Sequence, residues 1–397
     1  MGHSTDGHSD DVGHDDPSSD PLVRSEHFPK PLRRCPADWE PLDSVWLAWP
    51  HNRETWPGRF EPIPVFFADL ACLIARSVPV HLIGNESSKA EAADLMRHAK
   101  LRGEGLRNEV HRTEVHQGKG FDVHWHLAPT NDCWIRDHGP VWVHAADGSL
   151  VAVDFAYNAW GGKYPPWDDD QKVAEQIASL QEEARETSKL CLEGGALETD
   201  GLGRLVTTTS ALLTSTRNPG WSQEDIATEL YRRLGVTEIA WIEPHPDGRP
   251  FLAGDDTDGH IDQLARFVDP ENMIVAVTDD TDSPDHESLG HAYRQLKLWA
   301  QSTQPRVTLH PVQIPPARTM GGVPVPQSYC NFLRLGPDRL LLPTFGTPET
   351  DGNALGVLRG LLPGAKMETV DCRDLSWGLG ALHCASHQQP RPAATTD

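Results

Sequence analysis

Short runs of apolar residues recur along the chain, and most of them are bounded by Gly, Pro or Asp. Runs of this length, rich in Val, Leu, Ile and Trp, predict β-strands, and several are too apolar for either strand face to be exposed. The predicted strands cover residues 44–50, 78–84, 133–144, 150–155, 203–213, 238–242, 272–278, 306–312 and 339–346.

Longer stretches between these strands carry apolar residues at helical spacing. They cover residues 64–77, 172–186, 224–235 and 286–302. Strands and helices therefore alternate, which is typical of α/β or mixed proteins in which helices cover the faces of sheets. Apolar density stays high from the Trp-rich segment at 36–50 to residue 391, so we expect a single domain over residues 25–391.

The two ends of the chain differ from this domain. Residues 1–24 are rich in Asp, Ser, Gly and His and hold few large apolar residues, which predicts a disordered acidic tail. Residues 392–397 contain no apolar run, and we expect them to fray.

Charge limits the partners that the protein can bind. The chain has 58 acidic and 35 basic residues, with a formal net charge of −23. Such a surface repels nucleic acid and attracts small cations, although solubility is an equally good reason for the excess acid. A small cationic substrate therefore fits the composition, whereas nucleic acid does not.

Hydropathy and cysteine usage indicate the compartment. No run of about 18 apolar residues exists, and the N-terminus lacks the basic and apolar regions of a signal peptide. The seven cysteines are scattered and form no CxxC pair, which fits reduced thiols. We expect a cytoplasmic protein with no membrane partner, and a homodimer is left open.

Polar residues gather beside Gly or Pro near the ends of predicted strands, where side chains can face a cleft. The segments are NDCWIRDHGP, LEGGALETDG, GDDTDGHIDQ, QSYCNF and GALHCAS, which contain Asp137, Glu193, His260 with Asp262, Asn331 and Cys384. Successive segments are separated by 53 to 71 residues. This roughly even spacing suggests a structural repeat in which each unit contributes a residue to one shared centre.

Cys384 has three possible roles: a nucleophile, a metal ligand, or a buried thiol that only packs. His383, Cys384 and His387, with the acidic run at 255–262, include residue types that bind metals. However, no HExxH or CxxC spacing occurs, and GLGALH lacks the third glycine of a dinucleotide-binding loop. We therefore expect neither a metal nor a cofactor.

The remaining set of a Cys, a His and several carboxylates suits attack on a guanidinium carbon. A guanidinium stays protonated and shares its charge over three nitrogens, so its carbon is a poor electrophile. An enzyme that attacks this carbon needs carboxylates to hold the N–H fork, a thiolate to attack and a His to protonate the leaving ammonia. The sequence contains all three.

Seven segments in order, over residues 36–391, resemble the motifs of agmatine deiminases, within the bacterial peptidylarginine deiminase family. They are NDCWIRDHGP, YNAWGGKYPPWDDD, LEGGALETDGLG, TSTRNPGWSQ, DDTDGHIDQLARFV, QSYCNF and LHCASHQQP. The resemblance implies the pentein fold of guanidino-group-modifying enzymes, a five-bladed pseudo-symmetric α/β propeller around a central site. It also implies a cofactor-free hydrolase that converts agmatine and water to N-carbamoylputrescine and ammonia, in putrescine and polyamine biosynthesis.

The resemblance also implies roles for single residues. Cys384 resembles the nucleophile, His260 the general acid and base, and Glu193 the acid that orients the His. Asp137 and Asp262 resemble the carboxylates that hold the guanidinium. The positions similar to pocket-lining residues are Trp134, Trp160 and Asn331, for which plain core packing or a turn is the alternative.

The chain departs from the family pattern in two places. The family usually has Gly-Gly-Gly-Asn where this chain has Gly378, Leu379, Gly380 and Ala381, and His138 stands where Thr is common. Two alternative functions therefore stay open. One is a peptidylarginine deiminase that forms citrulline, and the other is a catalytically impaired binding member of the fold.

The segment after Tyr157 bears on the choice between substrates. The peptidylarginine branch, as the resemblance implies, places arginines after Tyr-Asn to hold the free carboxylate of the substrate. This chain has Ala159, Trp160 and Lys163 there, followed by Trp167 and the run Asp168–Asp170. An aromatic and acidic rim suits the far ammonium of agmatine, so we expect agmatine to be preferred.

Overall fold

The computed structural model describes residues 22–24, 31–109 and 122–393. Most of the predicted N-terminal tail, residues 1–21, and positions 394–397 of the predicted C-terminal tail lie outside the described residues. Leu22–Arg24 forms strand β1, which pairs antiparallel with β11 (Glu238–Ile242).

The described residues form several separate sheets, and most of these sheets share one plan. In the clearest example, β6 (Val141–Ala145) and β7 (Leu150–Ala156) pair antiparallel, α5 (Val173–Gln181) follows, and β8 (Ala184–Cys191) runs parallel to β7. The repeated unit is thus an antiparallel strand pair, a helix and a parallel strand.

Three later segments repeat this unit in the same order. The first consists of β9 (Glu198–Thr199), β10 (Arg204–Thr208), α7 (Gln223–Leu234) and β11. The second consists of β12 (Ala265–Asp269), β13 (Asn272–Val277), α8 (His286–Ser302) and β14 (Thr308–Gln313). The third consists of β17 (Leu333–Arg334), β18 (Arg339–Thr344), α9 (Pro348–Leu361) and β19 (Lys366–Asp371).

One further sheet joins the two ends of the chain. The last strand, β20 (His387–Pro390), pairs antiparallel with β3 (Leu42–Ala48), which is followed by α1 (Pro62–Ile74) and the parallel strand β4 (Val80–Gly84). Helix α2 (Lys89–Glu109) then leads to the parallel strand β5 (Val123–Leu127). Cys384 consequently lies next to a strand whose place depends on residues about 340 positions earlier in the chain.

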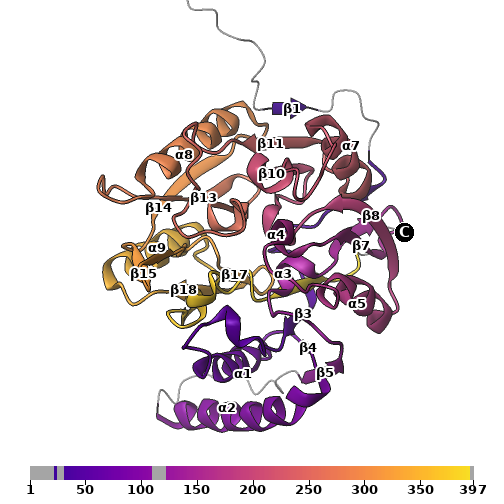
Figure 1. Ribbon diagram of the computed structural model, residues 1–397, viewed down its shortest axis with the longest axis vertical. Coiled ribbons are helices and arrows are strands. Elements are labelled where there is room, and N and C mark those ends of the chain that lie inside the picture. Colours follow the sequence, from indigo (N-terminus) through magenta and orange to yellow (C-terminus); the bar gives the residue numbers. More distant parts are fainter. Residues whose placement is uncertain (1–21, 25–30, 110–121, 394–397) are drawn as a thin grey trace, which may run out of the picture.

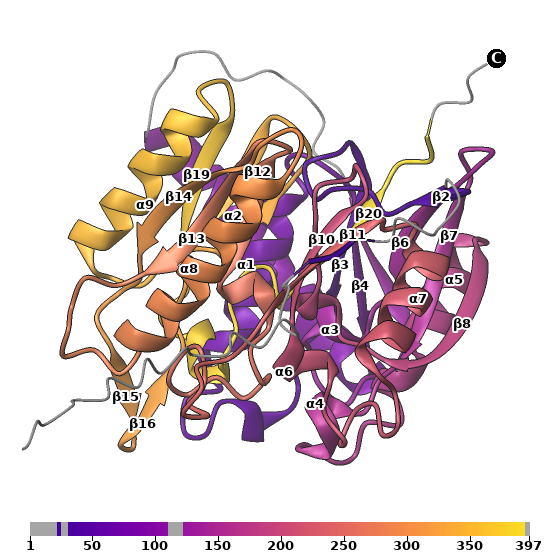
Figure 2. The same ribbon diagram turned by 90° about the horizontal axis from the view of Figure 1, so that it is seen from above.

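Figure 1 shows α8, α7, α5, α1 and α9 following one another around the molecule, while the short helices α3 (Ile135–His138) and α4 (Ala159–Gly162) lie nearer its middle. Figure 2 shows α8 and α9 on one side of the molecule, α5 and α7 on the other, and α3 between them. The remaining short elements are β2 (Arg33–Arg34), β15 (Arg318–Met320), β16 (Val323–Val325) and α6 (Thr209–Leu212).

The strand prediction from apolar runs is confirmed for most segments, because strands such as β13 are buried along nearly their whole length. Two predicted boundaries are wrong. Residues 133–144 begin with the helical turn α3, and the strand starts only at Val141, after Gly139 and Pro140 end the turn. The helix predicted over 172–186 ends at Gln181, where Glu182 adopts a left-handed conformation with φ 57°.

The structure also contains helices that the sequence did not predict. Helices α2 and α9 were not predicted, and α9 contains Gly352, Gly356 and Gly360, which lower helix propensity. Residues 209–212, predicted as strand, form α6. None of the helices in the described residues is long and apolar enough to cross a membrane.

Candidate active site

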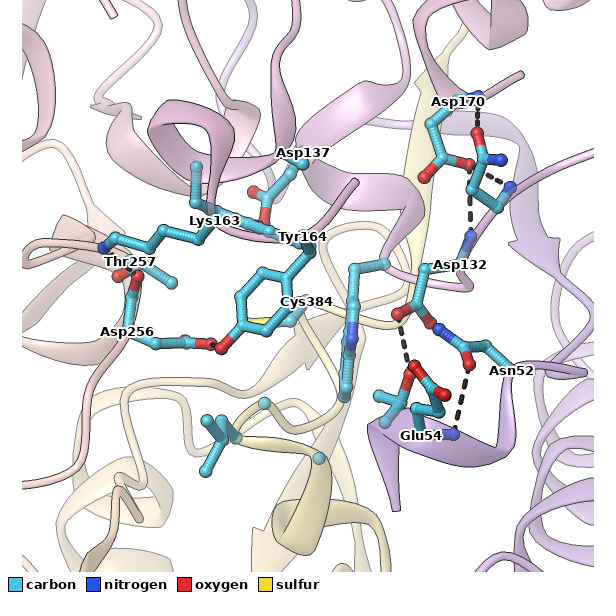
Figure 3. A pocket seen from close by; sticks show the side chains of 18 of the residues that line it. Asn52, Glu54, Asp132, Asp137, Lys163, Tyr164, Asp170, Asp256, Thr257 and Cys384 are labelled. Atoms are coloured by element: carbon cyan, nitrogen blue, oxygen red, sulfur yellow. Dashed lines mark hydrogen bonds between the residues drawn. The ribbon is translucent and has the colours of Figure 1, made fainter. Parts of the chain in front are cut away.

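A cavity of about 860 Å³ opens among the short elements that follow the strands. Cys384, Asp137, Trp134 and Trp160 all line it, and Figure 3 shows Asp137 and Cys384 in its wall. Four residues predicted from three separate sequence motifs therefore face one space.

Cys384 is held in a turn that precedes β20. The Nδ2 atom of Asn331 lies 3.1 Å from its Sγ, and the Oδ1 atom of Asn331 accepts the backbone N–H groups of His383 and Cys384 at 3.0 and 3.2 Å. The thiol also points toward Asp262, with Sγ 3.6 Å from Oδ2. Burial, followed by the charges of Asp262 and Asp137, raises the pKa of the thiol well above its usual value.

His260 lies between two carboxylates. Its Nε2 is 3.4 Å from Oε2 of Glu193, and its Nδ1 is 3.6 Å from Oδ1 of Asp137. Burial alone lowers the pKa of His260, but the nearby carboxylates outweigh burial and raise it to about 9. His260 is therefore protonated at neutral pH in this arrangement.

Gly195 explains how these groups approach so closely. A Cβ atom at this position would lie 2.5 Å from Nδ1 of His260 and 2.8 Å from Oδ1 of Asp137. The backbone N–H of Gly195 instead donates to Oδ1 of Asp137 at 2.9 Å. The second glycine of the LEGG motif thus makes room for the His and orients the carboxylate.

Asp137 and Trp160 are directly connected. The indole Nε1 of Trp160 donates to Oδ2 of Asp137 at 3.0 Å, and burial raises the pKa of this carboxyl to about 6. Ala159 and Trp160 have φ angles of 51° and 55°, in the left-handed region that non-glycine residues rarely adopt. Such strain is concentrated at functional sites, where the surrounding structure maintains it.

Asp262 faces Asp137 across the cysteine and histidine. Its Oδ2 bonds with Nδ1 of His383 at 2.8 Å and accepts from Nδ2 of Asn331 at 3.1 Å. Burial opposes ionisation, yet the contact with His383 and other neighbouring positive charges lower the pKa of Asp262. Its Oδ1 is buried and has no hydrogen-bond partner among the described residues, so it remains an acceptor.

Trp134 packs against the turn that departs from the family pattern. A Cβ atom at Gly378 or Gly380 would come within 2.8 or 2.6 Å of its ring, so both glycines are required for this packing. Between them, Leu379 has φ 71°, a left-handed conformation that favours glycine. The chain therefore keeps the unusual backbone of this turn even with a leucine in it.

Arg217 was not assigned a role from the sequence, although its motif TSTRNPG was recognised. Its Nε lies 2.8 and 2.9 Å from the two carboxylate oxygens of Glu193, and its Nη1 lies 2.6 Å from Asp258. The side chains of Arg217 and Glu193 are both fully buried. The guanidinium lowers the pKa of Glu193, in opposition to burial.

His383 is the second residue that the sequence did not identify. It bridges Asp262 and Asp38, and its Nε2 lies 2.9 Å from Oδ2 of Asp38. The sequence suggested His383 only as a possible metal ligand. In the structure its side chain instead contacts these two carboxylates. His387 lies on β20 and is buried there.

The expected acidic rim is only partly present. Asp170 lines the cavity, but Trp167, Asp168 and Asp169 are not among its lining residues. Instead, Tyr164 and Asp256 line it, and the tyrosine hydroxyl donates to the Asp256 carboxylate at 2.6 Å. Lys163 is paired with Asp258 at 2.8 Å.

The fold and this centre define an α/β protein with a buried cysteine, a histidine and several carboxylates around one cavity. A family model described as Porphyromonas-type peptidyl-arginine deiminase matches residues 34–390. The chain therefore belongs to that family.

Individual relatives agree with this assignment. The agmatine deiminase of Pseudomonas aeruginosa (strain LESB58) is 31% identical over 386 residues, which cover 90% of this chain and 96% of that protein. The agmatine deiminase of Stutzerimonas stutzeri (strain A1501) is 30% identical over 380 residues, which cover 90% and 95%. A solved structure of the agmatine deiminase of Enterococcus faecalis superimposes with a TM-score of 0.76 at 26% identity, covering 91% of this chain and 97% of that one.

Proposed function

We propose that this protein is a hydrolase that converts agmatine and water into N-carbamoylputrescine and ammonia. The observation that carries the proposal is that Cys384 and Asp137 line one cavity, with Asp262 at 3.6 Å from the thiol and His260 at 3.6 Å from Asp137. The relatives named agmatine deiminase support the choice of substrate.

The two central carboxylates suit a guanidinium. Asp137 and Asp262 flank the thiol, and their oxygens can accept the N–H groups of the planar fork. Both carboxylates are buried, and a buried carboxylate attracts a cation more strongly than an exposed one does, since the surrounding protein screens charge less than water does. The guanidinium carbon is then held against Sγ of Cys384.

The cysteine begins the reaction as a neutral thiol. A bound guanidinium places a positive charge beside Sγ and so favours loss of the thiol proton to water, from which the thiolate regains a proton when the product has left. The thiolate attacks the guanidinium carbon and forms a C–S bond. Protonated His260 gives its proton to one amino group, which leaves as ammonia, and a thiouronium remains on Cys384.

Water completes the cycle. Neutral His260 takes one proton from a water molecule as its oxygen adds to the thiouronium carbon. The C–S bond breaks with its electron pair on sulfur, and the second proton of the water leaves with ammonia as ammonium. The products are the ureido compound, the thiolate and protonated His260, so the step needs no oxidant, reductant or metal.

Two further features belong to the proposal. The five units of two antiparallel strands, a helix and a parallel strand are proposed to close into a five-bladed pentein propeller, which is supported by the pairing of β20 with β3 across the chain ends. We also propose a cytoplasmic location, which is supported by free thiols such as Cys133, Cys191 and Cys330. A role in polyamine biosynthesis rests on the proposed product, N-carbamoylputrescine.

The family model favours one rival, a peptidylarginine deiminase that forms citrulline. Such a substrate brings a main chain and, at a C-terminal arginine, a carboxylate. The basic side chains that line the cavity are already engaged, since Arg53 pairs with Glu61 and Lys163 pairs with Asp258. A carboxylate entering the cavity therefore meets mainly acidic groups.

Ammonia release separates these functions. We expect the protein to release ammonia from agmatine with kcat/KM at least about tenfold higher than for free arginine or a peptide ending in arginine, or about 1.4 kcal/mol of transition-state discrimination. Cys384→Ser should abolish release by at least about a thousandfold while the protein stays folded. Cys35→Ser, far from the cavity, is the matched control and should retain activity.

Equal or better efficiency on the peptide would favour the peptidylarginine deiminase. No ammonia from any guanidino compound would favour a binding protein without activity.

A further inference from the structure

The cavity has a second acidic wall that the proposed chemistry does not use. Asp132 and Asp170 lie on the opposite side of Cys384 from Asp256 and Lys163, as Figure 3 shows. Both line the cavity, and the side chain of Asp170 is only 3% exposed. Buried carboxylates are normally paired with a cation, so Asp170, with the partly buried Asp132 beside it, requires an explanation.

Neither carboxylate has such a partner. Among the described residues, no Lys or Arg lies within ion-pair distance of either one, and the nearest imidazole nitrogen, Nε2 of His138, is 3.9 Å from Oδ1 of Asp170. Burial raises the pKa of Asp170 to about 7, and it also raises that of Asp132. A cation beside them would restore the ionised forms of both.

The carboxylates retain acceptor capacity. Asp170 accepts the backbone N–H groups of Asn131 and Asp132, at 2.7 and 3.2 Å, through one oxygen. Asp132 accepts from the Thr55 hydroxyl and the Cys133 N–H, both at 2.7 Å. A carboxylate has about four lone-pair sites, so each has room for a further donor.

Two buried hydroxyl groups belong to residues that also line the cavity. Thr130 is 3% exposed and Tyr157 is 4% exposed; burial raises the pKa of Tyr157, and the charges of Asp170 and Asp132 contribute to this rise. Neither the Thr130 Oγ1 nor the Tyr157 hydroxyl has a hydrogen-bond partner among the described residues. Buried polar groups are nearly always paired, so both hydroxyls have capacity for a polar group that enters the cavity.

The opposite wall is different. The Asp256 carboxylate accepts from the Tyr164 hydroxyl, and the Lys163 ammonium contacts its backbone carbonyl. Asp256 therefore already has a hydrogen-bond donor and an ammonium beside it, whereas no Lys or Arg of the described residues lies within ion-pair distance of Asp132 or Asp170. The two walls therefore differ in their affinity for an ammonium group.

We propose that Asp132, Asp170, Thr130 and Tyr157 form a subsite for a primary ammonium group. An ammonium has three N–H donors, which match two carboxylates and the lone pairs of the hydroxyls. A metal ion fits less well, since no group of three His, Cys, Asp or Glu side chains in the described residues has the arrangement of a metal site.

The ammonium can come from two sources. It is either the far amine of the guanidino substrate or the amine of a separate diamine that binds beside it. Binding of the far amine of the substrate rests on the proposed function, whereas binding of a separate diamine does not.

The first experiment measures kcat/KM for agmatine and for 1-butylguanidine, which has the same guanidinium and carbon chain but no amine. The variants are Tyr157→Phe and Thr130→Val, which remove a hydroxyl that has no protein partner, and Asp170→Asn. If the substrate supplies the ammonium, each variant lowers kcat/KM for agmatine at least about fivefold more than for 1-butylguanidine, or about 1 kcal/mol. Tyr293→Phe, on α8 outside the cavity, is the matched control and should change neither value.

The second experiment titrates putrescine into the Cys384→Ala protein by calorimetry, so that binding is measured without turnover. If a separate diamine supplies the ammonium, putrescine binds, and Tyr157→Phe and Asp170→Asn in the same background weaken its affinity at least about fivefold. In that case, the variants of the first experiment leave the ratio of kcat/KM for agmatine to kcat/KM for 1-butylguanidine unchanged.

The subsite is overturned if the hydroxyl and carboxylate variants change neither the substrate ratio nor putrescine affinity, in which case water occupies the wall. Failure of the proposed function gives another result: the wild-type protein releases no ammonia from either guanidine, while the putrescine titration still reports on the subsite.

Discussion

At the scale of single residues, the proton distribution around Cys384 and His260 differs from that of a preformed thiolate–imidazolium pair, because here both groups hold a proton. Burial and two carboxylates raise the pKa of the thiol, whereas nearby carboxylates raise the pKa of the histidine to about 9. The free protein at pH 7 therefore holds a neutral thiol beside a charged imidazole. The nucleophile becomes reactive only when a cation enters the cavity.

Alkylation tests this proton distribution. A raised pKa means that the thiolate forms only at high pH, so iodoacetamide should modify Cys384 slowly at pH 7 and faster as the pH rises. Peptide mass mapping measures the rate at Cys384 itself. Fast modification that is constant between pH 6 and 8 would instead reveal a thiolate in the free protein.

Arg217 gives the second residue-scale prediction. It is the buried partner of Glu193, and removal of one member of a buried ion pair leaves the other charge uncompensated. We expect Arg217→Met to lower the free energy of unfolding by about 3–5 kcal/mol. The pH profile of kcat/KM should also move, because Glu193 sets the charge next to His260.

Urea unfolding and the pH profile are the measurements. The matched control is Arg249→Met, which removes an exposed pair with Asp247 and should leave the unfolding midpoint unchanged. A folded Arg217→Met protein with unchanged stability and an unchanged profile would contradict the positioning role.

At the scale of elements, the helices that separate the strands are defined by their own sequences. Helix α7 begins with a capping box, in which the Ser222 hydroxyl accepts the Asp225 N–H at 3.1 Å and Asp225 accepts the Ser222 N–H at 2.9 Å. It ends at Gly235, whose φ of 71° suits glycine. These local signals explain why the predicted helix at 224–235 is confirmed to within one residue.

The cap should contribute measurably to stability. Ser222→Ala removes the hydroxyl acceptor and should lower the free energy of unfolding by about 1 kcal/mol. Ser222→Thr keeps a hydroxyl in place and should restore most of it. Urea unfolding of both variants is the measurement, and equal losses in the two would show that the hydroxyl contributes nothing.

Elements also carry the site residues to one place. Asp137 lies in α3, His260 lies just before a short helical turn, and Cys384 lies shortly before β20. The even spacing of the motifs predicted a repeat, and the repeated order of strands and helices agrees with it. The turn at 133–140 was harder to predict, because Cys133 and Ile135 are buried in the core and Trp134 lines the cavity, so its apolar run does not mark a strand.

At the scale of the whole molecule, the net charge of −23 acts on any charged substrate. A negative surface raises the local concentration of a cation, and salt screens this attraction. We expect kcat/KM for agmatine to fall at least about twofold between 10 and 150 mM salt. Alkylation of Cys384 by uncharged iodoacetamide is the matched control and should stay constant. An equal salt dependence of both reactions would point to a change in the protein rather than to steering.

The sequence by itself determined the alternation of strands and helices, the chemistry of a Cys, a His and carboxylates, and the motifs that carry them, because apolar periodicity and residue type are local properties. Only the tertiary structure decided which groups meet. Arg217 binds Glu193, His383 bridges Asp262 and Asp38, and the hydroxyls of Thr130 and Tyr157 have no partner within the described part of the chain. These contacts join segments far apart in the chain, and the burial that shifts the pKa values of Cys384 and His260 exists only once the sheets have packed together.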